Sequence, residues 1–304
     1  MLTDEQIDRF HRDGLLVIRS VFDRDEVRAL QRAADEVTAE AVAGRGTGHG
    51  YREVDGRRQY YRTDGVLWDR DAAFRMATVN PRLLSAVGQC LGHPFMPIND
   101  SLVVKLARSG VAIRWHQDPP YEGSDGLPNT FGIPNFDCDI YLDEATVENG
   151  CLYGLTGYHL AGHVEVERFE EEELFGRPDA VALSMHAGDV LLHSISAPHG
   201  SRANDSGTLR RIFYVHFMAR ETLEALHPDW IGTKPGFGEQ DVGRVRSMIQ
   251  ERARAGLAEP GTEKVELTLE GFVFTGDPAT QPRRWESLIA SMTSEQRRRA
   301  KTLT

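Results

Sequence analysis

The chain has 304 residues, of which 40% are hydrophobic and 27% charged, as in ordinary globular proteins. Its 46 acidic and 35 basic side chains give a formal net charge of −11, which argues against a partner such as nucleic acid or an anionic membrane surface. The length allows one domain of roughly 200 to 250 residues with extensions, or two smaller ones.

Targeting and cysteine signals are sparse. The longest apolar runs, such as residues 14–18, are far shorter than the roughly 20 residues of a membrane-spanning helix. Residues 1–6 lack the basic and apolar regions of a secretory signal. Three cysteines without a Cys-x-x-Cys pair argue against a disulfide framework and a zinc ribbon. We therefore expect a cytoplasmic protein.

The chain is predicted to begin with a short helix and a strand. Thr3 and Gln6 have the spacing of a capping box, and apolar residues follow at helical spacing. Gly14 ends this helix, and residues 15–18 form an apolar run typical of a buried strand.

Two further helices are predicted before residue 94. Asp23 and Glu26 repeat the capping box ahead of an alanine-rich helix that runs to about Val42. Asn80 before a proline caps another helix, which Gly92 ends. This N-terminal part is therefore expected to be mainly helical.

Residues 44–65 have many glycines and no period, which predicts a mobile loop. Aromatic side chains lie in and just after it: Tyr51, Tyr60, Tyr61 and Trp68. Either a lid that closes over a small organic substrate or an ordinary packed loop fits this composition. A stacking surface for nucleic acid does not fit the net charge.

From residue 95 to 220 the pattern changes to short strand-like runs separated by Gly, Pro, Asp and Asn. These runs are residues 102–106, 111–115, 138–142, 188–192 and 210–218. They predict a mainly β core, a sandwich or jelly roll. Residues 241–255 are again helical and residues 265–274 alternate, so 221–304 is expected to be a helical extension, a possible lid or interface.

Trp115-His116-Gln117-Asp118 ends one β run ahead of two prolines. His116 and Asp118 are two residues apart, so on a strand both side chains point to one face. One imidazole and one carboxylate on a rigid strand can supply two adjacent metal ligands, although the pair alone is also typical of a solvated strand end.

A second segment strengthens the metal interpretation. His199 lies in a Pro/Gly corner between two strand-like runs, and Arg210 begins the second run. Two histidines and a carboxylate on one face leave three metal positions open, as in non-haem Fe(II) oxygenases. A nearby arginine can hold the carboxylate of a co-substrate through a bidentate pair.

Together these motifs resemble the phytanoyl-CoA dioxygenase family, which includes bacterial hydroxylases of small molecules such as ectoine. The resemblance rests on His116-x-Asp118, His199-Gly-Ser201, Arg210 eleven residues after the second histidine, and the turn at residues 148–152. The run at residues 188–191 and the opening of the chain also match, so the resemblance covers roughly residues 2–220.

The resemblance implies a double-stranded β-helix (jelly roll, cupin-like) enzyme that uses Fe(II), 2-oxoglutarate and O2. It implies a single catalytic domain, residues 1–304, with the jelly roll at 95–220. By the same resemblance, iron is bound by His116, Asp118 and His199. Arg210 and Ser201 would bind the distal carboxylate of 2-oxoglutarate, and Asn99 its other end.

The chain departs from the family at Thr156-Gly157-Tyr158-His159, where many relatives have Pro-Gly-Ser-His. Asp118 stands where family halogenases have a small residue, so hydroxylation is favoured over halogenation. His193 is an alternative third ligand of the metal. Otherwise it is either a histidine of the core or one that contacts the metal ligands without binding the metal. Arg211 faces away from Arg210 and is expected in an ion pair.

Strand alternation suggests two substrate contacts. Arg114 shares a face with His116, so it could meet an anionic group, although an edge-strand salt bridge is the alternative. Residues 136–142 place Asp137, Asp139 and Tyr141 on one face, which could hold a cationic or hydroxyl-rich substrate. Asp139 is the residue we expect to make that contact.

The predicted function is hydroxylation of an unactivated C–H bond of a small molecule, coupled to decarboxylation of 2-oxoglutarate to succinate and CO2. Desaturation, epoxidation and cyclisation are alternatives with the same cofactors. A catalytically silent jelly-roll binding protein is the alternative of another class. The oligomeric state stays open.

Overall fold

The computed structural model describes residues 1–92, 94–118, 135–160, 164–220, 239–257 and 264–276. The predicted N-terminal helices are confirmed as α1 (Asp4–Asp13), α2 (Arg24–Val42) and α5 (Pro81–Leu91). Both capping boxes are formed, and the Asn80 side chain accepts hydrogen bonds at the start of α5. Two short helices, α3 (Leu67–Arg70) and α4 (Ala72–Thr78), lie between α2 and α5 in the sequence.

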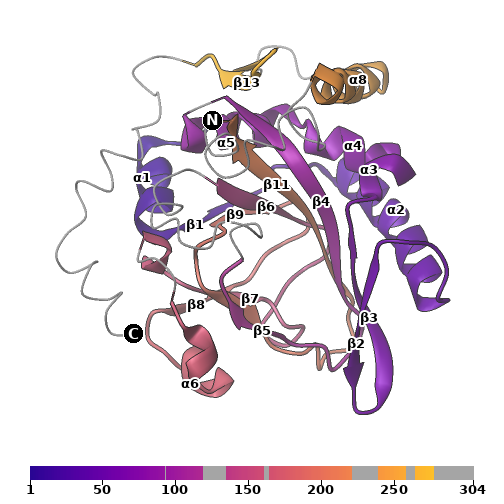
Figure 1. Cartoon of the computed structure of the whole chain (residues 1–304), viewed down its shortest axis with the longest axis vertical. Coiled ribbons are helices and arrows are strands. Elements are labelled where there is room, and N and C mark those ends of the chain that lie inside the picture. Colours follow the sequence, from indigo (N-terminus) through magenta and orange to yellow (C-terminus); the bar gives the residue numbers. More distant parts are fainter. Residues whose placement is uncertain (93, 119–134, 161–163, 221–238, 258–263, 277–304) are drawn as a thin grey trace.

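Antiparallel strands form two sheets, which confirms the predicted jelly-roll core. The major sheet has the order β1 (Leu15–Ile18), β9 (Val190–Ser194), β6 (Asn135–Tyr141), β11 (Arg210–Ala219), β4 (Phe95–Lys105), β13 (Gly271–Phe274) and β12 (Val265–Thr268). The smaller sheet has the order β5 (Ile113–His116), β10 (His199–Ser201), β7 (Leu152–Leu155) and β8 (Ala180–Leu183). In Figure 1, helices α2 to α4 lie to the right of β4, and β5, β7 and β8 lie to its lower left.

Short elements complete the described chain. They are η2 (Tyr158–Leu160), η3 (Val166–Arg168), α6 (Glu171–Phe175) and α8 (Glu239–Arg254). The last of these confirms the helix predicted near residues 241–255. In the described ranges, no helix is long and apolar enough to cross a bilayer.

The two faces of the major sheet have different chemistry because strand residues alternate. On one face Phe136, Cys138 and Ile140 of β6 are buried in the apolar core, together with Leu30 of α2 and Phe74 of α4. The opposite face therefore carries the intervening polar residues of β6, β9 and β11. This polar face is where a site can be built.

The prediction of a mobile loop over residues 44–65 is wrong, because β2 (His49–Val54) and β3 (Arg57–Asp64) form a hairpin there. Asp55 and Gly56 make its two-residue turn, with φ of 51° and 70°. Asp-Gly is a strong signal for such a turn, since both positions need positive φ. The composition of the segment concealed that signal.

The aromatic side chains of this region pack into the fold rather than forming a lid. Tyr60 is buried, and its ring centroid lies 6.1 Å from that of Tyr51. Trp68 is also buried and donates from its Nε1 to the hydroxyl of Thr78, 2.8 Å away. Strand β3 pairs with β4, which places Thr63 opposite Leu102. The hairpin is thus an extension of the major sheet.

The sheets also extend beyond the expected core at 95–220. Strand β1 pairs with β9 along its whole length, and the hairpin β12–β13 lies beside β4 through the pair Phe272 and Phe95. The alternating run at 265–274 is therefore part of the major sheet. Segments before and after the motif-bearing region complete one architecture.

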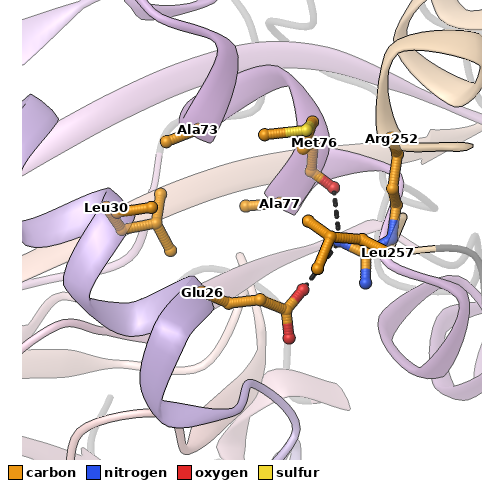
Figure 2. A pocket seen from close by; sticks show the side chains of 8 residues that line it. Glu26, Leu30, Ala73, Met76, Ala77, Arg252 and Leu257 are labelled. Carbon is orange, nitrogen blue, oxygen red and sulfur yellow. Dashed lines mark hydrogen bonds and ion pairs between the residues drawn. The ribbon is translucent and has the colours of Figure 1, made fainter. Parts of the chain in front are cut away.

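A buried ion pair attaches α8 to the N-terminal helices. A small pocket between α2, α4 and α8 is lined by Glu26, Leu30, Ala73, Met76, Ala77, Arg252 and others, and Figure 2 shows Arg252 reaching Glu26 across it. The Nη1 of Arg252 lies 2.7 Å from Oε1 of Glu26 and donates to the carbonyl of Met76. Both side chains are almost fully covered.

We expect Arg252→Met to lower the free energy of unfolding by about 3 kcal/mol, because it leaves the Glu26 carboxylate buried without its cation. Arg244→Met on the same helix is the matched control. Arg244 pairs with the exposed Asp69, so its loss is expected to cost less than about 1 kcal/mol. Chemical denaturation measures both, and equal losses would contradict the prediction.

Candidate active site

The smaller sheet places two histidines side by side. His116 ends β5, His199 begins β10, and the two residues are paired in the ladder with ring centroids 4.3 Å apart. Trp115, which precedes His116 in the chain, is buried in a separate apolar cluster, which fixes the strand. Asp118 donates its backbone N–H to the carbonyl of Ile195, 2.9 Å away, and so remains beside this pair.

His116, Asp118 and His199 each offer one ligand atom, and these atoms lie within 4.8 Å of one another. The Nε2 of His116 is 3.6 Å from Oδ1 of Asp118, and the Nε2 of His199 is 3.8 Å from Oδ2. The structure thus brings together the three residues predicted to bind iron.

The tautomer of each histidine suits a metal ligand. The Nδ1 atoms of His116 and His199 face the carbonyls of Arg114 and Ala197, at 2.7 and 3.0 Å. A proton on Nδ1 leaves the lone pair of Nε2 directed at the cluster. Burial and the neighbouring His116 lower the pKa of His199 to about 3, so its imidazole is neutral. Burial alone would lower the pKa of His116, but the hydrogen bond and the charge of Asp118 raise it, so a metal that binds here displaces a proton more readily from His199 than from His116.

His193, the alternative ligand, lies behind Asp118. Its Nδ1 is 2.9 Å from Oδ1 of Asp139, and its Nε2 is 3.4 Å from Oδ2 of Asp118 and 3.9 Å from Oδ2 of Asp137. Burial alone would lower the pKa of His193, but the charge of Asp139 and the bond to Asp118 raise it well above its usual value. Both ring nitrogens of His193 face carboxylates, which suits a proton donor that orients Asp118. His193 also forms, with Asp118 and Asp137, a second group of side chains that could hold a metal ion.

The opposite end of the polar face has buried donors without acceptors. Arg210 is almost fully buried and donates from Nη1 to the carbonyl of Gly150, 2.6 Å away. Within the described ranges its Nε has no hydrogen-bond partner, and neither has the hydroxyl of the buried Tyr141. Such unsatisfied donors fit a carboxylate ligand. Strand alternation predicted that Tyr141 points to this face, but it gave no indication that Tyr141 and Arg210 could bind the same ligand.

Lys105 is a buried cation that the sequence analysis did not single out. It lies opposite Arg210 in the ladder, and its Nζ donates to the carbonyls of Val111 (3.1 Å), Ser201 and Arg202. Burial and the charge of Arg210 lower its pKa to about 6. A lone lysine within an apolar strand run was the signal that could have revealed it.

Ser201 lies on the smaller sheet, and Asn99 lies on the polar face of the major sheet. Ser201 is buried at the end of β10, and its carbonyl accepts from Lys105, near Arg210. Asn99 is paired with His216 in the ladder. It lies six residues from Lys105 along β4, which corresponds to ~20 Å of strand. Asn99 therefore lies at the metal end of the face, as its expected role requires.

The two expected substrate contacts have other partners. The Arg114 side chain is 72% exposed, and its Nε lies 3.3 Å from Oε1 of Glu171, which is the salt bridge weighed as the alternative. Asp139 is fully buried against His193, whereas its neighbour Asp137 is 17% exposed. Exposure therefore favours Asp137 over Asp139 as a contact for a substrate.

Two further side chains stabilise the fold. Arg211 faces away from the site and forms ion pairs with Asp143 at 2.8 Å and Asp35 at 2.5 Å, as expected from alternation. His159, at the departure from the family pattern, is buried with its Nε2 3.1 Å from the carbonyl of His11.

Comparisons with known proteins match this chain to one enzyme family. The family model described as phytanoyl-CoA dioxygenase (PhyH) matches residues 10–212. A protein of Gimesia maris named methylphosphonate hydroxylase is 25% identical, over 92% of this chain and 98% of its own.

Two solved structures share the fold. EctD from S. alaskensis, solved with 2-oxoglutarate and 5-hydroxyectoine, is 24% identical with a TM-score of 0.60, over 73% of this chain and 77% of its own. SnoK is described as a non-haem α-ketoglutarate-dependent carbocyclase from nogalamycin biosynthesis. It is 20% identical with a TM-score of 0.59, over 90% of this chain and 96% of its own.

Proposed function

Because the chain belongs to the phytanoyl-CoA dioxygenase family, an enzyme family that uses non-haem Fe(II) and 2-oxoglutarate, we propose that it hydroxylates an unactivated C–H bond of a small polar molecule. In each turnover O2 would be consumed and 2-oxoglutarate would be converted to succinate and CO2. The observation that carries this proposal is the cluster of His116, Asp118 and His199, together with the buried Arg210, whose Nε makes no hydrogen bond in the described part of the chain.

The proposed ligands of iron are His116, Asp118 and His199. Two imidazoles and one carboxylate on one side of the metal leave positions for the co-substrate and O2, and the bound iron supplies the oxidising chemistry. The protein orients these ligands: the carbonyls of Arg114 and Ala197 fix the histidine tautomers, and His193 fixes the carboxylate. Preset ligands do not have to reorganise when the metal binds.

Arg210, Ser201 and Tyr141 are proposed to bind the distal carboxylate of 2-oxoglutarate. Arg210 Nε and the Tyr141 hydroxyl are buried donors, so a carboxylate there gains bonds that these donors lack. Asn99 at the metal end is proposed to contact the other end of the co-substrate. Burial of this cavity also excludes water from the reaction.

The substrate class is inferred from the relatives and from the polar face. Methylphosphonate hydroxylase and the ectoine dioxygenases among the relatives are named for small polar molecules. Asp118 fills the third ligand position, which favours hydroxylation over halogenation. Desaturation, epoxidation and cyclisation use the same cofactors and differ in the mass of the product. We treat residues 1–304 as one catalytic domain, and the cytoplasmic location stays a prediction.

An anaerobic titration with Fe(II) and 2-oxoglutarate tests the proposal. The expected result is a weak visible charge-transfer absorption of the bound chelate, followed by succinate release when O2 is admitted. Absence of both signals would defeat the proposal and favour a silent binding protein. Candidate substrates are then screened by coupled succinate release, and product mass distinguishes hydroxylation from desaturation.

A further inference from the structure

A strip of polar side chains crosses four adjacent strands next to the proposed iron site. The strip consists of Asn99 on β4, His216 on β11, Asp137 on β6 and His193 on β9. Each residue is paired directly with the next in the antiparallel ladders, so all four side chains point to the same face of the major sheet. Figure 1 shows β6, β9, β11 and β4 next to one another in this sheet.

Within this polar strip, Asp137 is placed to meet a substrate. One of its oxygens lies within 4.8 Å of ligand atoms of Asp118 and His193, so a molecule bound over the iron would be within its reach. Its side chain is partly accessible, whereas Asp139 on the same strand is fully covered. A partly accessible carboxylate beside the proposed iron ligands is suited to contact a bound substrate.

The charge of Asp137 lacks a close partner. Its Oδ1 is buried and makes no hydrogen bond in the described part of the chain, and the nearest cationic candidates are His216 Nδ1 at 3.7 Å and His193 Nε2 at 3.9 Å. His193 lies closer to two other carboxylates: its Nδ1 is 2.9 Å from Oδ1 of Asp139, and its Nε2 is 3.4 Å from Oδ2 of Asp118. Three carboxylates thus share one imidazole, and a buried carboxylate without a partner is costly.

Arg62 is a further charge that acts on Asp137: burial raises the pKa of this carboxyl, and the positive charge of Arg62 lowers it. Arg62 of β3 points to the same face of the major sheet as the polar strip. Its Nη2 is 2.5 Å from Oδ1 of Asp64, and that oxygen also accepts a hydrogen bond from the hydroxyl of Ser101. Arg210 lies toward the other end of the face, where the distal carboxylate of 2-oxoglutarate is proposed to bind. Among the described residues, the metal end of this face thus has three carboxylates, Asp118, Asp137 and Asp139, around His193, and a bound Fe(II) would offset the charge of Asp118.

We propose that Asp137 binds a cationic group of the substrate, so that the molecule oxidised carries a protonated amine or amidine close to the attacked C–H bond. An N–H donor of such a group bonds to the accessible part of the Asp137 carboxylate and offsets its charge. This inference rests on the proposed function, because it places the substrate over the iron site.

Probes of matched size and different charge test the inference. Butylammonium, butanol, butyrate and methylphosphonate are titrated into the anaerobic wild-type complex with Fe(II) and 2-oxoglutarate, and the change in its visible absorption reports binding. Butylammonium is expected to bind at least about tenfold more tightly than butanol, and the two anions more weakly than butanol.

Variants assign the preference to one carboxylate. Asp137→Asn is expected to bring butylammonium and butanol to within about twofold of each other. Asp137→Glu is expected to keep the preference. Asp25→Asn, which makes the same change of net charge on the exposed surface of α2, is the control and is expected to behave as the wild type.

Several outcomes would overturn the inference: tighter binding of either anion, equal binding of all probes, no saturable response to any probe, or a preference that survives in Asp137→Asn. The wild-type probe series does not depend on the folding of any variant. Failure of the proposed function is a different result, because the absorption of the Fe(II)–2-oxoglutarate complex would then not form before any probe is added.

Discussion

Asp118→Ala is expected to weaken Fe(II) binding by at least about 100-fold and to abolish succinate release at iron concentrations that saturate the wild type. In many metal sites, loss of a residue that only hydrogen-bonds to a ligand already lowers metal affinity or activity about 10- to 100-fold. Asp118 is the proposed carboxylate ligand itself, so its loss is expected to weaken binding at least as much. It also faces both histidines of the cluster, at 3.6 and 3.8 Å. Iron affinity is measured anaerobically, with circular dichroism to confirm the fold.

Companion variants identify the third ligand. His199→Ala is expected to lose iron as completely as Asp118→Ala, whereas His193→Ala is expected to lose about tenfold in affinity, because it orients the carboxylate without binding the metal. The exposed His186 serves as the control, and His186→Ala should leave the affinity unchanged. Retention of iron by His199→Ala together with its loss in His193→Ala would assign the ligand to His193 instead.

Arg210→Met is expected to raise the dissociation constant of 2-oxoglutarate by about 100- to 1000-fold while iron binding persists. A carboxylate that enters this buried pocket would lose its cation, a loss that typically costs several kcal/mol. Isothermal or spectroscopic titration of the Fe(II) enzyme with 2-oxoglutarate measures the change. Arg210→Lys should recover part of the affinity, because the charge remains but the planar pair of donors does not.

Arg211 is the matched control for Arg210, because the two adjacent arginines lie on opposite faces of β11. Arg211→Met breaks the ion pairs with Asp143 and Asp35, so it is expected to lower stability and leave the affinity for 2-oxoglutarate unchanged. Equal loss of affinity in both variants would show that the effect is not specific to the pocket and would contradict the role proposed for Arg210.

Local rules predicted much of the fold. Capping boxes at Thr3 and Asp23 located α1 and α2 because the bonds that cap a helix join residues three apart in the chain. Alternation likewise predicted which residues of β6 face the apolar core. The hairpin at residues 49–64 was missed although its turn is local, because glycine content was weighed above the Asp-Gly dipeptide.

Residue chemistry and spacing also predicted a cofactor class. Two histidines, a carboxylate and an arginine at fixed separations were sufficient to identify the family and its cofactors, and the three predicted ligands lie together in the structure. The substrate contacts were harder to predict. Arg114 and Asp139 lie on the expected faces, yet Glu171 binds the first and His193 covers the second.

The sequence by itself determined the helices, the alternating faces and the residue types of the metal site, because these depend on neighbours within a few positions. Only the tertiary structure decided that His193 lies behind Asp118, and that the Tyr141 hydroxyl and Oδ1 of Asp137 are buried without a hydrogen bond in the described part of the chain. Those properties depend on the register between strands distant in sequence and on which carboxylate reaches a shared cation first. Spacing along one strand carries no information about that competition.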